Sequence, residues 1–290
     1  MIYDITHTTQ YEYGDTVPEC FNIVRLYPRP IFDQACQTHQ LEIEPQPREL
    51  VLRKDFFGNL VEQFSIDFPH GNLKVVSRNS VSVTSRQYPD FETTPAWETI
   101  ANADLVSDLL ASQLRWNSPH VRKSRALADY SLVSFTKDRP IAVAAVDLTR
   151  RIFEDFAFDP QATTVSTPVE EVFNNRKGVC QDFAHLQIAC LRSLNLPARY
   201  VSGYLRTEPP PGQQRLIGAD ASHAWVSLYC GPDSWFDFDP TNNLVPETDH
   251  ISIAWGRDYA DVCPIQGVFT GGGNTLMRVS VDVAPRAGSN

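Results

Sequence analysis

The chain has 290 residues, of which 42% are hydrophobic and 21% are charged, a composition typical of a folded globular protein. Its formal net charge of −10 argues against a protein that binds nucleic acid or an anionic membrane surface by general electrostatic attraction. A chain of this length can form two domains or one large one.

The cysteines and the first residues set expectations about metals and compartment. The six cysteines are irregularly spaced and form no Cys-x-x-Cys pair, so we expect no zinc or dithiol redox site, and no cofactor. Residues 1–15 lack the basic start and apolar core of a signal peptide. No apolar run approaches the roughly 18 residues of a membrane span. We therefore expect a cytoplasmic protein with reduced thiols and no membrane partner.

The first 88 residues have the pattern of a β-rich domain. Residues 2–13 alternate between the two faces of a strand, and shorter runs follow, separated by turns rich in Pro, Gly and Asn. These runs are residues 22–27, 38–45, 49–55, 59–68 and 72–84. Several short strands at this spacing predict a sandwich-like domain at 1–88.

The pattern becomes helical after a polar, proline-containing stretch at 89–96, which we predict to be a linker. We expect a helix from Pro140 to Phe156, because Pro140 suits a first helical position and apolar residues follow on one face. Further helices are expected at 104–116, 124–134 and 168–174. Residues 97–290 are assigned to one catalytic domain.

Cys180 stands at the start of a predicted buried helix that follows Gly178 and stops near Asn195 and Pro197. The exposed N–H groups and the dipole of a helix N-terminus favour a thiolate, which is the reactive form of cysteine. A free cysteine more often simply packs in a core, and we expect this of Cys190 in the same helix. Partners are therefore needed to mark Cys180 as a nucleophile.

Two such partners follow in a predicted hairpin. Residues 222–230 alternate as a strand, a turn follows at 231–233, and residues 234–238 form the returning strand. The hairpin brings His223, near the start of one strand, beside Asp239, just past the end of the other. Between the Cys180 helix and this hairpin we expect a strand at 198–205. A proline-rich surface loop at 207–219 follows it and is a candidate wall or lid for a site.

A cysteine at a helix N-terminus, a histidine and an aspartate have the logic of a catalytic triad. The histidine takes the thiol proton and later gives it to the leaving group, and the aspartate orients the imidazole and stabilises its charged form. The backbone N–H of Cys180 could donate to an oxyanion, and Gln181 is a possible second donor. The natural electrophile is an amide or ester carbonyl.

The segments Gly-Val-Cys180, Ser-His223-Ala-Trp225 and Trp235-Phe-Asp-Phe-Asp239-Pro-Thr-Asn242 resemble the transglutaminase-like superfamily. The closest likeness is to its bacterial and archaeal branch of predicted cysteine proteases. The resemblance implies an α+β, papain-like core preceded by an N-terminal β-sandwich-like domain. It also implies Cys180 as nucleophile, His223 as base and Asp239 as orienting acid.

Other positions near this constellation are candidates for substrate or oxyanion contacts. Trp225 and Tyr229 share the predicted strand face of His223 and could line an acyl pocket, although aromatic residues on a strand more often belong to a core. The resemblance places Asp258 and Tyr259 near the site, whereas the sequence alone predicts a solvated loop there.

The resemblance leaves three functions open. The favoured one is hydrolysis of peptide-like amide bonds, or acyl transfer, through a thioester on Cys180. A calcium-independent protein-glutamine transglutaminase is an alternative. However, the animal cross-linking enzymes carry an aromatic residue after the cysteine, where this chain has Gln181, and no calcium loop is evident. The third is a non-catalytic module that binds peptides in the same groove. The substrate and the oligomeric state are not predicted.

Overall fold

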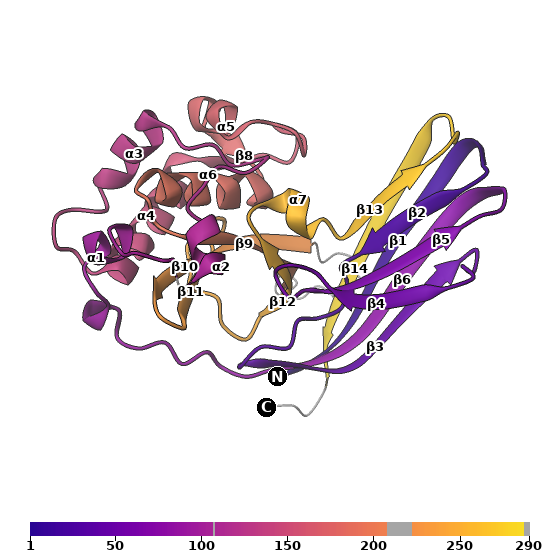
Figure 1. Cartoon of the computed structure of the whole chain (residues 1–290), viewed down its shortest axis with the longest axis horizontal. Helices are drawn as coiled ribbons and strands as arrows, with labels where there is room; N and C mark the ends of the chain where they lie inside the picture. The colour runs from indigo at the N-terminus through magenta and orange to yellow at the C-terminus, as the bar shows by residue number, and fades with distance from the viewer. Residues whose placement is uncertain (107, 208–221, 287–290) are drawn as a thin grey trace, which may run out of the picture.

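A computed structural model describes residues 1–106, 108–207 and 222–286 (Figure 1). A sandwich of long strands forms one side of the molecule, and a smaller sheet with most of the helices forms the other. None of the helices in these ranges is long and apolar enough to cross a membrane.

The sandwich consists of two four-stranded antiparallel sheets, as the alternating pattern of residues 1–88 predicts. One sheet has the order β14 (Thr275–Pro285), β1 (Ile2–Val17), β6 (His70–Val83) and β3 (Gln34–Glu44). The other has the order β13 (Ile265–Phe269), β2 (Cys20–Val24), β5 (Leu60–Ile66) and β4 (Leu50–Lys54). Apolar side chains between the sheets, among them Val24, Phe64 and Val75, form the sandwich core.

Two strands of this sandwich come from the C-terminal end of the chain. β14 pairs with β1 along its whole length, from Tyr3 opposite Pro285 to Tyr13 opposite Thr275. β13 pairs with β2 in the other sheet. The sandwich therefore contains residues 265–285, which the sequence analysis grouped with the catalytic region at 97–290.

The third four-stranded sheet, called the central sheet below, has the order β11 (Ser234–Phe238), β10 (Ser222–Gly231), β9 (Ala198–Leu205) and β12 (His250–Gly256). It lies between the sandwich and the helices (Figure 1). The buried helix α6 (Cys180–Ser193) packs against β9 and β10. The other helices are α1 (Trp97–Ala101), α2 (Leu109–Gln113), α3 (Arg125–Leu132), α4 (Ile141–Asp155), α5 (Val169–Asn175) and α7 (Tyr259–Val262).

Three short elements complete the described structure. A 3-10 turn covers Phe91–Thr93, within the predicted linker, and the short strands β7 (Ala157–Phe158) and β8 (Lys177–Gly178) pair in parallel. The helix expected at 104–116 is confirmed only in its central part, because the Asp108 side chain caps the first turn of α2 at Ala111, and α2 ends at Gln113.

The sandwich sheet that contains β1 and β6 also holds the two sides of the molecule together. Near the start of β1 and the end of β6 it packs through Tyr3, Ile5 and Val81 against Ile251 and Ile253 of β12. Polar contacts accompany this apolar cluster: the Gln34 side chain bonds Ser252 through both backbone groups, at 2.8 Å each. The central sheet is thus fixed against the sandwich on the side away from α6.

Candidate active site

Cys180 is the first residue of α6, as the sequence predicts, and it is partly exposed. The backbone N–H groups of a first helical turn have no intrahelical acceptor, so they point toward whatever lies beyond the helix start. Cys180 therefore combines access from outside with the positive end of the helix.

The start of α6 is fixed by the carboxylate of Asp182. This buried side chain turns back and accepts the backbone N–H of Val179 at 2.8 Å and the hydroxyl of Thr163 at 2.6 Å. The space it occupies exists because residue 178 is glycine: a Cβ there would lie 2.8 Å from the carboxylate. Gly178 and Asp182 together set the position of Cys180.

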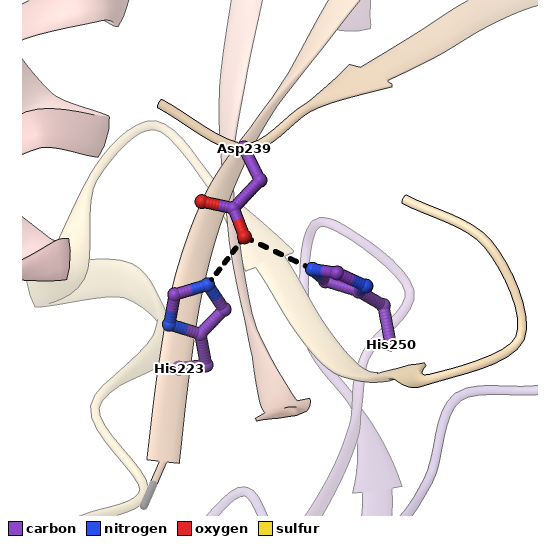
Figure 2. Close-up of side chains that lie close together, drawn as sticks. All are labelled: His223, Asp239 and His250. Carbon is purple, nitrogen blue, oxygen red and sulfur yellow. Dashed lines mark hydrogen bonds and ion pairs between the residues drawn. The ribbon is translucent and has the colours of Figure 1, made fainter. Parts of the chain in front are cut away.

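His223 and Asp239 meet as the predicted hairpin requires. β10 and β11 pair with Val226 opposite Phe238, which places the start of β10 beside the end of β11. The Nε2 atom of His223 lies 2.8 Å from Oδ2 of Asp239 (Figure 2). Both side chains are buried, so this bond forms in a medium that screens charge weakly.

The electrostatics of this pair favour an ionised carboxylate and a charged imidazole. Burial alone would lower the pKa of His223, but the hydrogen bonds and charges of Asp239 and Cys180 raise it to about 10. Burial alone would raise the pKa of Asp239, yet the bonds from His223 and His250 hold it well below its usual range. Cys180 is thus close enough to His223 to affect the protonation of its imidazole.

The Asp239 carboxylate is held by several further donors. Its Oδ2 atom accepts from Nδ2 of Asn242 at 2.7 Å, and its Oδ1 atom accepts from the backbone N–H of Thr241 at 2.9 Å. The Asp-Pro-Thr-Asn turn of residues 239–242 therefore cages the carboxylate that orients His223. This satisfies the hydrogen-bonding needs of a buried charge.

His250, which the sequence analysis did not single out, also belongs to this cluster. It begins β12, and its Nε2 atom lies 3.1 Å from the same Asp239 oxygen (Figure 2). Burial lowers the pKa of His250 despite the carboxylate, so at neutral pH it acts as a neutral donor. The ligand atoms of His223, Asp239 and His250 lie within 4.8 Å of one another and could hold a metal ion, although both Nε2 atoms already bond Asp239.

Trp225 packs against the rings of His223 and His250. Its side chain is fully buried, its ring lies edge-on to His250 with centroids 5.1 Å apart, and its Nε1–H donates to Asp237 at 3.0 Å. The indole crosses over Gly203 of β9, where a Cβ would come within 2.6 Å of it. Trp225 therefore holds the two histidine rings in place and, being fully buried, offers no surface to a substrate.

The comparisons with known proteins agree with this geometry. The family model of the transglutaminase-like superfamily matches residues 119–240, a range that contains Cys180, His223 and Asp239. The model of the bacterial transglutaminase-like N-terminal region matches residues 3–82. The chain is 40% identical over 295 residues to the uncharacterized protein Rv2569c of Mycobacterium tuberculosis, which covers 99% of this chain and 93% of that protein. The chain belongs to the transglutaminase-like superfamily.

Members of this superfamily are usually enzymes. Two further similar proteins are of this kind. The protein-glutamine gamma-glutamyltransferase of Pseudomonas aeruginosa is 34% identical over 128 residues, which are 43% of this chain and 19% of that enzyme. The crystal structure of a predicted cysteine protease from Cytophaga hutchinsonii superimposes with a TM-score of 0.75 at 22% identity, covering 99% of this chain and 91% of that one. The shared fold confirms the predicted α+β core with an N-terminal sheet domain.

The remaining predicted site residues have partners elsewhere in the structure. The side-chain amide of Gln181 donates to the carbonyl of Val165 at 3.2 Å, so it ties the loop before α5 to the start of α6. Tyr229 is buried near the far end of β10, against Trp235. The predicted proline-rich loop at 207–219 lies almost wholly outside the described residues.

Asp258 and Tyr259 lie next to α6, near His185 rather than Cys180. Asp258 is buried, caps α7 and accepts the backbone N–H of His120 at 2.8 Å. The backbone N–H of Tyr259 donates to Nε2 of His185 at 3.1 Å. These contacts give both residues structural partners, while a role in binding substrate stays a prediction.

Proposed function

We propose that the protein is a cysteine-dependent amide hydrolase of the peptidase or amidase type, with Cys180, His223 and Asp239 as its triad. Cys180 and His223 act as a thiolate–imidazolium pair in which the thiol proton is held on His223, and the thiolate attacks the carbonyl carbon of the substrate. The C–N bond breaks, the amine leaves with the proton from His223, and a thioester remains on Cys180. Water then attacks the thioester, His223 accepts its proton and returns it to the departing thiolate.

The observation that carries this proposal is the caged Asp239 carboxylate, 2.8 Å from His223, beside a partly exposed Cys180 at a helix start. The carboxylate fixes the ring and stabilises the imidazolium that forms when the thiol loses its proton. The N–H groups of the first turn of α6 could stabilise the oxyanion of the tetrahedral intermediate. These features support the proposal of an acyl-transfer site.

Transfer of the acyl group to an amine is the second candidate, and the Pseudomonas aeruginosa gamma-glutamyltransferase favours it. The two functions share every step up to the thioester and differ only in the acceptor. The departure at Gln181, whose side chain is bonded to Val165, gives no direct support for an amine acceptor site. We therefore rank hydrolysis first.

The shared thioester step can be tested without knowing the natural substrate. We expect p-nitrophenyl acetate to release a burst of p-nitrophenolate and to leave an acetyl group on Cys180, detected by mass spectrometry of the intact protein and its peptides. Cys180→Ala and His223→Ala should lose the burst, while Cys36→Ser, a partly buried cysteine in the sandwich, should keep it. A burst that persists in folded Cys180→Ala would exclude this mechanism.

A second assay separates water from amine as acceptor. The acylated protein is offered a primary amine at increasing concentration, and free acetate and acetylated amine are both quantified. Hydrolysis predicts acetate as the main product at all amine concentrations. Amine capture that competes well with water would instead favour the transglutaminase alternative. A protein that forms no thioester yet binds peptides would fit the non-catalytic module.

A further inference from the structure

A cavity of about 360 Å³ lies at the junction of the sandwich and the central sheet, away from Cys180. Its walls come from the segment between β2 and β3, the residues after β6, and strands β9, β11 and β12. The lining includes Phe32, Asp33, Arg86, Arg199, Trp235 and Trp255. Its charged lining residues are Asp33, Arg86, Arg199, Asp233 and Asp237. A cavity of this size, with aromatic walls and polar groups that converge on it, is typical of a small-molecule site.

Arg199 is the unusual member of this lining. Its side chain is 92% buried (8% exposed), and its guanidinium lies between two indole rings, 4.2 Å from the centroid of Trp235 and 3.7 Å from that of Trp255. Its Nε atom is buried without a hydrogen-bond partner, and within residues 1–106, 108–207 and 222–286 no carboxylate forms an ion pair with it. The buried Arg115 also has an unpartnered Nε, but its terminal nitrogens donate to the carbonyls of Ile100 and Ala103, and no such bond is seen for Arg199 among the described residues.

The surroundings compensate the charge of Arg199 only in part: Asp237 attracts it, but no carboxylate among the described residues forms an ion pair with it. The two aspartates nearby, Asp33 and Asp237, are both engaged by Arg86. A second guanidinium, that of Arg29, lies 3.5 Å from the centroid of the same Trp255 ring. Among the described residues its hydrogen bonds go only to neutral oxygens. Burial accordingly lowers the pKa of Arg199 to about 9. A buried charge without its own ion-pair partner is costly, and an anion in the cavity would reduce that cost.

We propose that this cavity binds the carboxylate of a small aromatic acid. The planar guanidinium of Arg199 suits a carboxylate, and the indole rings hold that guanidinium in place. Trp235, Trp255 and the exposed ring of Phe32 supply apolar surface for the body of the ligand. This site is independent of the proposed hydrolase activity, because none of these residues contacts Cys180, His223 or Asp239 in the described interactions.

The direct test is isothermal titration of the full chain with phenylacetate and with its neutral analogue phenylacetamide. We expect phenylacetate to bind with a dissociation constant below about 1 mM, more weakly at high salt, and phenylacetamide to bind at least about 10-fold more weakly. Absence of binding, or equal binding of the acid and the amide, would overturn the proposal.

Variants locate the site. Arg199→Gln should weaken phenylacetate binding by about 10- to 100-fold, whereas Arg115→Gln, the matched change at a buried arginine whose terminal nitrogens are already bonded and which lies outside the cavity lining, should leave it unchanged. Asp233→Asn removes a negative charge from an exposed position on the cavity rim and should strengthen binding at low salt without disturbing the fold. If Arg199→Gln does not fold, the Asp233→Asn result decides. Unchanged binding in Asp233→Asn at low salt, or in folded Arg199→Gln, would contradict the site.

Discussion

The Nε2 atom of His250 lies 3.1 Å from Oδ2 of Asp239, the same oxygen that is hydrogen-bonded to His223. One carboxylate oxygen thus serves two histidines, of which only His223 has Cys180 as a further partner. We therefore propose His250 as a positioning residue, because its hydrogen bond to the proposed triad goes to Asp239 and its ring also lies 5.8 Å from that of His223. It also lies outside the region matched by the superfamily model.

We predict that His250→Phe lowers kcat for thioester formation by about 10- to 100-fold, because the carboxylate loses a donor and can rotate away from His223. The measurement is the burst rate with p-nitrophenyl acetate as a function of pH. A merely structural role would lower the amount of folded protein without changing the pH profile of the remaining activity. An unaltered rate and profile would show that Asp239 does not need this donor.

Gly203 is predicted to be the most sensitive glycine of the central sheet. In Gly203→Ala the new methyl group would meet the Trp225 ring and the backbone oxygen of Ile251, neither of which can move cheaply. We expect a loss of about 1 to 3 kcal/mol in the free energy of unfolding, measured by denaturant titration. Gly71→Ala, where no heavy atom lies within 4 Å of the added carbon, is the matched control and should change stability little. Equal effects of the two changes would refute this packing account.

Asp182 is predicted to matter for both stability and reactivity. Asp182→Ala removes the acceptor of the Val179 N–H and of the Thr163 hydroxyl, so we expect a loss of about 1 to 2 kcal/mol and slower acylation of Cys180. Thr163→Val removes only one of these bonds and should have the smaller effect on both quantities. The comparison uses thermal or denaturant unfolding together with the burst assay. A larger effect in Thr163→Val would show that the cap does not fix the helix start.

The pH dependence of stability should reveal the buried neutral histidines. Burial, together with His120 and Arg192, lowers the pKa of His185 to about 3, whereas the unfolded value is about 6.5. Between these values the unfolded state binds the proton and the folded state does not, so stability falls as pH decreases from about 6.5, by up to about 1.4 kcal/mol per pH unit. His185→Gln should flatten this slope in denaturant titrations, independently of its effect at higher pH. An unchanged slope would contradict the assignment.

His223 acts in the opposite pH range. Its pKa is raised to about 10, so its contribution to stability is complete below about pH 6.5 and is lost as the pH rises toward 10. It therefore adds no slope on the acidic side and does not obscure the effect of His185.

The parts of the site that sequence could predict are those fixed by local signals. The start of α6 at Cys180 follows from the glycine before it and the apolar spacing after it, and the meeting of His223 with Asp239 follows from one hairpin. His250 could not be found this way, because its place depends on the pairing of β12 with β9, some fifty residues earlier in the chain. Turn-forming residues such as Pro246 and Gly256 bound this strand, but they do not specify which distant strand it pairs with.

The fold shows the same division between local and distant information. The alternation within residues 1–88 predicts the strands. However, the pairing of β14 with β1 joins the two ends of the chain, and the sequence of neither strand indicates which strand it will pair with. Likewise, the strand face of Trp225 is predictable, whereas its burial depends on Gly203 of a neighbouring strand. Sequence patterns therefore gave the elements, and the structure was needed for their neighbours.

The central claim is that Cys180 is activated by His223, and alkylation by iodoacetamide tests it most directly. The rate at each of the six cysteines is measured by mass spectrometry across a pH series, in the wild type and in His223→Ala. Burial raises the pKa of the Cys190 thiol to about 12 and that of Cys36 to about 11, so both should react slowly at neutral pH. We predict that Cys180 reacts fastest, still rapidly near about pH 6, and that His223→Ala removes this advantage. Alkylation of Cys180 as slow as that of Cys190, or fast alkylation that survives in His223→Ala, would contradict the account.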